Sequence, residues 1–325
     1  MAYTAETWPI AAALLQFPGT LRDGSSVQDA PVESWVETLS EVGRVGFDNV
    51  DLTDSWLRIG DLTPARHAEF ASALRHLSLT VPAVSITRRS VADPVAGTEN
   101  LAYAHRTIDA AAELGAGVLS IGFHQPLTAA QREQLWFWNA AGAADDVDDP
   151  TAWARAVARI SELGRHAADA GLLVSIELYE DTFFGTADSA VRFIEDVDLP
   201  NVGINPDIGN LLRLHRPVER WQDMLAKTLP YANYWQVKNY TRDEDPLTGA
   251  IVTTPAPLEL GVVDYRTAIR DAVALGFDGV ITCEHYGGDG LGISARNMRY
   301  LRTLLPSEPA LGAVQSADVL KEHVG

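Results

Sequence analysis

The sequence predicts an α/β protein formed by a single (β/α)8 (TIM) barrel, and three observations lead to this prediction. Short apolar runs typical of buried strands alternate with longer amphipathic, helix-period segments along most of the 325 residues. Eight such units occur, at intervals of 29 to 56 residues. No apolar run is followed by a Gly-x-Gly-x-x-Gly turn, which weakens the competing prediction of a doubly wound open sheet.

The elements follow one another in a regular order. The predicted strands are residues 10–15, 47–52, 80–86, 117–123, 172–177, 202–207, 234–239 and 279–284. The helical segments include residues 32–46, 65–79, 100–116 and 264–277, and several end in Gly, which signals helix termination. Two longer intervals predict insertions after strands four and seven, at residues 125–150 and 240–260. We therefore assign residues 1–306 to the barrel and 307–325 to a C-terminal tail.

Composition and charge exclude several classes of protein. Lys and Arg number 25 against 44 Asp and Glu, and the net charge of −19 disfavours binding to nucleic acid or to an anionic membrane. The single cysteine, Cys283, forms neither an internal disulfide nor a multi-thiolate zinc site. The N-terminal apolar stretch has no preceding Lys or Arg, and no run approaches the roughly 20 apolar residues of a membrane span. We expect a cytoplasmic protein.

Four consecutive predicted strands end in a side chain with an oxygen donor. These residues are Glu177, Asp207, Gln236 and Glu284. The carboxyl ends of barrel strands converge at one mouth, where the active site of such a barrel lies. Buried carboxylates at this mouth would repel one another and lose hydration, and a divalent cation would relieve both problems. The alternative is that each acid merely begins a loop.

The segments around these strand ends resemble a known family. They are LLVSIELYE (172–180), INPDIGNLL (204–212), YWQVKNY (234–240) and LELGVVDYRTAIRDAVALGFDGVITCEHYGG (258–288). They look like the xylose isomerase-like barrel superfamily of sugar (phosphate) isomerases, epimerases and inosose dehydratases. The similarity extends from about residue 9 to residue 306 and is strongest over residues 172–286.

The family pattern implies Glu177, Asp207 and Glu284 as ligands of one divalent metal. Its remaining ligand is usually the His of a His-x-Lys-Asp strand, but residues 236–239 read Gln-Val-Lys-Asn. The family's Asp-x-Gly-His motif appears as Asp-Ile-Gly-Asn at residues 207–210. Both departures remove an imidazole, and the remaining hard oxygen donors favour Mn²⁺, or else Mg²⁺, over zinc. They also disfavour the apurinic endonuclease branch, whose trinuclear zinc site is rich in His.

A hard cation at such a mouth holds adjacent sugar oxygens and stabilises an enediolate after a proton is removed beside a carbonyl. A base must then stand over that carbon. His124, after strand four, is the first candidate, because imidazole titrates near neutrality. His285 is the second, and Lys238 is the third, as an electrostatic or acid group. Either His could instead be a surface ring or a core ring with satisfied hydrogen bonds.

Aromatic and polar residues near the strand ends are candidates for substrate binding. They are Trp56, Arg88, Trp136, Trp138, Tyr179 and Asn210. Trp136 and Trp138 lie in the insertion after strand four, where their rings could stack on a sugar or aromatic aglycone or pack as a lid onto the barrel rim. Arg88 is a candidate contact for an anion or a sugar hydroxyl, or a merely solvated side chain.

Within the superfamily, the PDIGN and QVKNY strands and the Trp-rich fourth loop resemble the large (α) subunit of bacterial C-glycoside deglycosidases. This resemblance implies a Mn²⁺-dependent lyase that cleaves the sugar–aryl carbon–carbon bond of 3-oxo-C-glucosides and assembles with a small β subunit. The same enediolate chemistry serves a sugar (phosphate) isomerase or epimerase or an inosose dehydratase, which the sequence does not separate. A non-catalytic sugar-binding scaffold is the third hypothesis. We also expect an oligomer.

Overall fold

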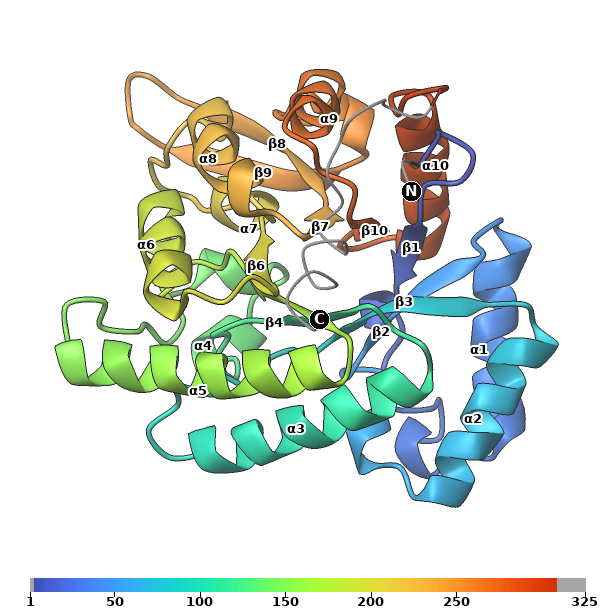
Figure 1. Ribbon diagram of the computed structural model, residues 1–325. Helices are drawn as coiled ribbons and strands as arrows, with labels where there is room; N and C mark the ends of the chain where they lie inside the picture. The colour runs from blue at the N-terminus through green and yellow to red at the C-terminus, as the bar shows by residue number, and fades with distance from the viewer. Residues whose placement is uncertain (1–2, 309–325) are drawn as a thin grey trace.

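The computed structural model describes residues 3–308 and contains the eight parallel strands that the sequence predicts (Figure 1). They are β1 (Ile10–Ala13), β2 (Asn49–Thr53), β3 (Thr80–Ser85), β4 (Val118–Ile121), β5 (Leu173–Glu177), β6 (Val202–Asn205), β7 (Tyr234–Val237) and β10 (Val280–Cys283). Their hydrogen-bonded order is β6-β5-β4-β3-β2-β1-β10-β7. The predicted barrel is therefore confirmed. The predicted tail, apart from residues 307–308, lies outside the described residues.

Helices surround the ring of strands, as Figure 1 shows. The α-helices are α1 (Val32–Arg44), α2 (Pro64–His76), α3 (Gly97–Glu113), α4 (Ala129–Arg132), α5 (Pro150–Asp169), α6 (Ala187–Val197), α7 (Gly209–Leu212), α8 (Trp221–Thr228), α9 (Tyr265–Ala274) and α10 (Gly290–Arg302). Short 3-10 helices are η1 (Leu14–Gln16), η2 (Val27–Asp29), η3 (Ile59–Asp61), η4 (Phe137–Asn139), η5 (Leu229–Tyr231) and η6 (Leu258–Leu260). Within this part of the chain, no helix combines the length and apolarity that a membrane crossing needs.

Local sequence explains where these helices begin and end. Helix α2 starts with Pro64 after Thr63, whose hydroxyl accepts a hydrogen bond from the third helical amide. Helix α5 starts in the same way, because Asp149 caps its first amides just before Pro150. Helix α9 stops at Ala274, and Gly276 follows with a φ of 91°, a left-handed conformation that glycine adopts without strain. These residues therefore set where the three helices begin or end.

The apolar residues form two layers, because successive side chains along a strand point to opposite faces of the sheet. Ile10 and Ala12 of β1 belong to the large cluster that also contains the helix faces, whereas Ala11 between them joins a smaller cluster. The smaller cluster consists of Ala11, Ala83, Val118, Tyr234 and Val280, with Leu173 packed against it. It is contributed by strands from around the ring, so it fills the barrel interior as this fold requires.

The barrel closes between β6 and β7 mainly through one side chain. The only backbone bridge assigned there among the described residues joins Ile204 and Ala232. The Asn205 amide instead accepts a hydrogen bond from the Gln236 backbone N–H at 2.9 Å and donates one to the Gln236 side-chain oxygen at 2.7 Å. Asn205 thus replaces ladder hydrogen bonds and at the same time orients Gln236.

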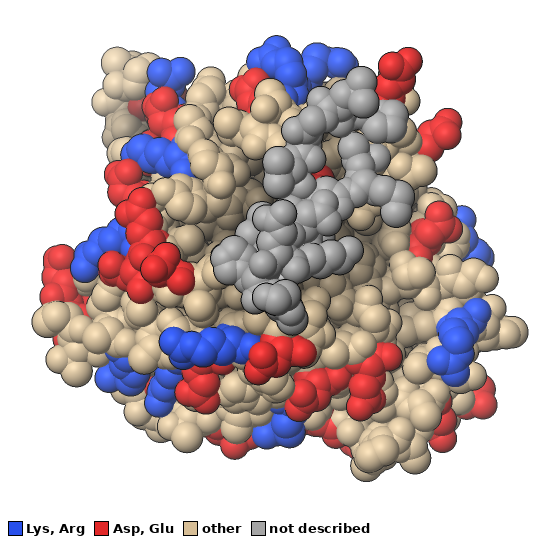
Figure 2. All heavy atoms as spheres, viewed as in Figure 1, with Lys and Arg blue, Asp and Glu red and all other residues tan. Residues whose placement is uncertain are grey.

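Both predicted insertions are present on the barrel rim. The first contains α4 and η4, and the second forms an antiparallel hairpin of β8 (Asn239–Glu244) and β9 (Ile251–Ala256). The two insertions meet, because Trp138 packs with Tyr240 and Leu214 in a separate apolar cluster. In Figure 2, acidic and basic side chains are interspersed over the visible face rather than gathered by sign.

Candidate active site

The four predicted oxygen donors lie at the carboxyl-terminal mouth of the barrel. Glu177 is the last residue of β5, Asp207 follows β6 by two residues, Gln236 belongs to β7 and Glu284 directly follows β10. All four side chains are buried. Strand-end register, read from the sequence alone, therefore predicted that these four side chains lie at the same mouth.

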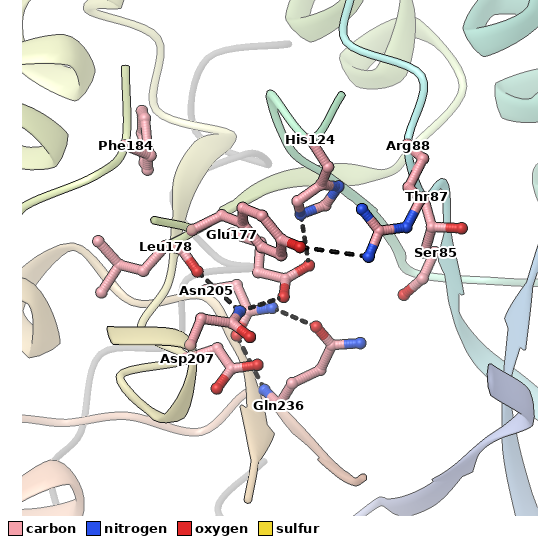
Figure 3. Close-up of polar contacts among 12 residues, drawn as sticks. Ser85, Thr87, Arg88, His124, Glu177, Leu178, Phe184, Asn205, Asp207 and Gln236 are labelled. Atoms are coloured by element: carbon pink, nitrogen blue, oxygen red, sulfur yellow. Dashed lines mark hydrogen bonds and ion pairs between the residues drawn. The ribbon is translucent and has the colours of Figure 1, made fainter. Parts of the chain in front are cut away.

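Glu177 forms one half of a buried acid–imidazole pair (Figure 3). Its Oε2 lies 3.0 Å from Nε2 of His124, and its Oε1 accepts a 2.6 Å hydrogen bond from the Asn210 amide. Burial acts to raise the pKa of the Glu177 carboxyl, but the charge and hydrogen bond of His124, the Lys238 ammonium and the Asn210 amide outweigh it and lower that pKa to about 2. Glu177 is therefore held as a carboxylate facing the imidazole.

Lys238 lies between the other two carboxylates. Its Nζ is 2.7 Å from Asp207 Oδ2 and 2.9 Å from Glu284 Oε1. Burial would lower the pKa of the Lys238 ammonium, but attraction to Asp207 and Glu284 raises it well above its ordinary value. Lys238 consequently stays charged and cannot serve as a general base, which leaves the predicted electrostatic or acid role.

Gln236 is clamped from two sides. Its oxygen accepts from Asn205, as described above, and its Nε2 donates to Asp51 Oδ2 at 3.3 Å. Asp51 is fully buried and also accepts hydrogen bonds from Ser85 and Tyr234. Burial raises the pKa of the Asp51 carboxyl to about 6, although these three donors oppose the shift. The amide orientation of Gln236 is therefore fixed, with its oxygen on the side of the carboxylates of β5 and β6.

A pocket opens directly onto these groups and has an empty volume of about 530 Å³. It is lined by Leu15, Thr53, Ser55, Thr87, Arg88, His124, Glu177, Tyr179, Gln236, Glu284 and Tyr286. A molecule bound inside it would meet carboxylates, an imidazole, hydroxyls and two tyrosine rings. Another pocket of similar empty volume, about 530 Å³, lies between α6 and α8, away from these residues, and its lining contains no His or Asp.

Arg88 reaches across this pocket from the loop after β3. Asp54 accepts hydrogen bonds from the backbone and hydroxyl of Thr87 and pairs with Arg89, so both neighbours of Arg88 are tied to one carboxylate. Arg88 itself adopts a φ of 54°, and its guanidinium donates to Tyr179 Oη at 3.3 Å and to a backbone carbonyl (Figure 3). A non-glycine residue in this conformation stores strain that the surrounding contacts maintain.

A buried arginine ties the first insertion to the strand ends. The Arg213 guanidinium bonds both oxygens of Glu180 at 2.8 and 2.7 Å and is fully buried. Its carbon lies within 4.8 to 5.8 Å of four ring centroids, those of Phe137, Trp138, Tyr179 and Tyr286. One cation thus packs against the insertion, the loop after β5 and the loop after β10 at once.

The donor set fits a hard divalent cation, although the four side chains do not form one cluster. Within residues 3–308, no group of three or more His, Cys, Asp and Glu side chains is close enough together to hold a metal ion. Instead, Glu177 faces His124, and Asp207 and Glu284 face Lys238. However, neither oxygen of the buried Asp207 has hydrogen-bond geometry to a donor. Burial, with repulsion from Glu284 and Glu177, raises the pKa of the Asp207 carboxyl well above its ordinary value despite Lys238. A further positive charge beside Asp207 would therefore stabilise its ionised form.

Comparison with known proteins gives the family. The model of the xylose isomerase-like TIM barrel family matches residues 39–323. The chain belongs to this family. A protein of the same family from Mycobacterium smegmatis, solved in complex with magnesium, is 47% identical with a TM-score of 0.91, over 94% of this chain and 99% of that one.

Two further relatives are epimerases. A ketose 3-epimerase from Arthrobacter globiformis is 27% identical over 289 residues, which are 86% of this chain and 88% of the relative. The 3-keto-D-glucoside 4-epimerase of E. coli has the same fold, with a TM-score of 0.63 and 16% identity over 91% of this chain and 99% of that one. The chain thus has the barrel of its family in common with both of these epimerases.

The structure places some predicted substrate-binding residues away from the pocket. Trp56 is buried in the core against Phe70, so the prediction that it lines the mouth is not supported. Trp136 and Trp138 stack on each other with centroids 5.2 Å apart and pack on the rim, as the lid alternative predicted, and neither lines the pocket. The two rings cover each other, and Trp138 also packs against Arg213 and against Tyr240 of the hairpin.

Two other predicted residues, Asn210 and His285, lie outside the pocket lining. Asn210 is buried and bonds Glu177 and the Leu178 carbonyl, so it positions a carboxylate rather than touching substrate. His285 does not line the pocket, whereas its neighbour Tyr286 does. Tyr179 and Arg88 line it as predicted. The alternation of the strand could have indicated Tyr286, since residues 284 and 286 share a face in extended backbone.

Proposed function

We propose that the chain is a divalent-metal-dependent enzyme that epimerises or isomerises a keto sugar by removing a proton from a carbon beside the carbonyl. The observation that carries the proposal is the buried His124–Glu177 pair in the wall of a pocket at the barrel mouth, where two further carboxylates also lie. The ketose 3-epimerase relative supports the reaction class, and the magnesium complex of the M. smegmatis relative supports the cation.

Each residue has a role that follows from its contacts. Glu177, Asp207, Gln236 and Glu284 would hold the cation, with Mg²⁺ or Mn²⁺ the ions that suit such oxygen donors. When bound, the cation supplies positive charge that stabilises the anion formed on the sugar oxygens. His124 takes the proton, because Nε2 lies 3.0 Å from Glu177 Oε2 and neither ring nitrogen has a partner with hydrogen-bond geometry. Glu177 orients the ring and stabilises the imidazolium that forms.

The charged Lys238 completes the electrostatics of the site. Its ammonium favours negative charge at the mouth, and it donates from a fixed position because two carboxylates hold it. Arg88 and Tyr179 line the pocket and orient the sugar through their polar ends. Burial of the surrounding rings excludes water from the reacting carbon.

Epimerisation takes precedence here over the carbon–carbon bond cleavage of 3-oxo-C-glucosides that the deglycosidase resemblance implied, because the relative from Arthrobacter globiformis is a ketose 3-epimerase. Elimination after the same proton removal is the alternative outcome. Manganese as the preferred ion, a small β subunit, an oligomer and a cytoplasmic location stay predictions. Size measurement of the chain alone and from its native source tests the assembly, and a fully active monomer would contradict it.

The proposal is tested by proton exchange in D₂O. The purified chain with Mg²⁺ or Mn²⁺ is incubated with free ketoses and with 3-oxo glycosides, and NMR follows loss of the proton beside the carbonyl and formation of the epimer. His124→Ala should keep its metal and lose roughly 10²–10⁴-fold in kcat and exchange, the usual contribution of a positioned base. His76→Ala, on the exposed end of α2, is the control and should leave both unchanged.

Two results would contradict the proposal in different ways. Exchange at the parent rate in His124→Ala would remove His124 as the base and leave His285 as the remaining imidazole near the mouth. Stoichiometric metal in Asp207→Ala would place the cation elsewhere. Gln236→His should shift the preference toward zinc, because imidazole suits that ion.

A further inference from the structure

The Lys238 ammonium lies inside the proposed metal site, between two of its carboxylates. Gln236 and Lys238 are two residues apart on β7 and its continuation, so both side chains point into the barrel. The Lys238 side chain is 2% exposed, and its ammonium is within 2.9 Å of an oxygen of both Asp207 and Glu284. Two of the three carboxylates that would hold a divalent ion are therefore already paired with a charge of this chain.

The charges at the mouth show why this pairing matters. A divalent ion bound by Asp207 and Glu284 would lie a few ångströms from the Lys238 ammonium, which is buried between the same two carboxylates. Like charges at that separation in a poorly hydrated site repel strongly. The same carboxylate oxygens cannot give their best geometry to both cations at once.

We infer that Lys238 competes with the divalent cation for Asp207 and Glu284 and so sets the metal affinity of the site, an inference that rests on the metal site of the proposed function. Without metal, the ammonium bridges the two carboxylates and balances one of their two negative charges. Metal binding breaks at least one Lys238 ion pair and displaces the ammonium from between them. The chain therefore binds its cation more weakly than the donor set alone would allow.

Calorimetric titration of the chelator-treated full chain with MgCl₂ and MnCl₂ tests this. Lys238→Met, which keeps the aliphatic length and removes the charge, should bind each ion at least about tenfold more tightly than the parent. Lys238→Arg, which keeps the charge, should not gain affinity. Lys227→Met is the matched control, because Lys227 also bridges two carboxylates, Asp188 and Glu219, but on the surface, and its removal should leave the titration unchanged.

Thermal unfolding gives a second readout that does not depend on activity. Lys238→Met leaves Asp207 and Glu284 unpaired, so in chelator it should unfold at a lower temperature than the parent, and added metal should raise its Tm by more than it raises the parent's. Lys238→Gln, which retains a hydrogen-bond donor, is the second variant with the same expectation.

The outcomes separate this inference from the proposed function. Equal or weaker metal binding by Lys238→Met and Lys238→Gln, together with loss of binding in Asp207→Ala, would overturn the competition and leave the metal site intact. Undiminished binding in Asp207→Ala would overturn both. Tighter binding by the two Lys238 variants, abolished when Asp207→Ala is added, supports the competition whether or not a sugar substrate has been identified.

Discussion

Replacement of Arg213 by methionine should be among the most destabilising single changes in this chain. Arg213 is fully buried, and the side chain of its partner Glu180 is only 8% exposed. Arg213→Met leaves the Glu180 carboxylate in a nearly dry environment without its counter-charge. It also removes the cation from a cage of four aromatic rings that includes Tyr179 of the pocket wall.

The size of the effect follows from burial. Removal of one partner of a buried ion pair costs about 3–5 kcal/mol, because the remaining charge is left unpaired. Glu180→Gln should cost a comparable amount for the same reason. The double variant should be less destabilised than the sum of the two, since it contains no unpaired charge.

Urea unfolding of the full chain, followed by circular dichroism, measures these free energies. Arg216 and Asp181 supply the control, because they form a 2.6 Å ion pair one loop away in which the arginine side chain is 52% exposed. Arg216→Met should cost no more than about 1 kcal/mol. The reasoning fails if Arg213→Met costs as little as Arg216→Met, or if the two single effects at Arg213 and Glu180 simply add.

Three further predictions concern the barrel closure, the buried acid beneath the site and the rim. Asn205→Ala removes the side chain that joins β6 to β7 and should cost about 1–3 kcal/mol through an unsatisfied amide, with faster hydrogen exchange in β7 by mass spectrometry. Burial raises the pKa of the Asp51 carboxyl from 3.8 to about 6, so its contribution to the free energy of unfolding is favourable below pH 3.8. That contribution, about 3 kcal/mol, is lost as the pH rises through 6. Because asparagine does not titrate, Tm should fall less steeply between pH 4 and 7.5 in Asp51→Asn than in the parent. Gly287→Ala should lower Tm more than Gly288→Ala. Both residues have positive φ, but only at 287 would a Cβ meet the Trp136 ring, at 2.6 Å. Equal losses of Tm would show that backbone strain alone accounts for the effect.

Much of the fold could be predicted because its signals are local. Apolar runs of strand length, helical periodicity and caps such as Thr63 with Pro64 depend on neighbours a few residues apart. The strand-end acids were found for a related reason. Once eight strands are placed in a parallel barrel, topology alone brings their carboxyl ends together, so register along the sequence predicts proximity in space.

The pairing of those groups was decided only by the tertiary structure. Nothing local in the sequence shows that Lys238 lies between Asp207 and Glu284, or that His124 rather than His285 faces the carboxylate of Glu177, because these contacts join residues 31 to 53 positions apart. The same limit applies to Trp136 and Trp138 of the first insertion. The sequence alone does not show whether their rings are free to stack on a sugar. In the fold, burial of their apolar surface against Arg213 and the second insertion is more favourable than exposure to solvent, and that choice depends on which distant side chains the barrel brings to its rim.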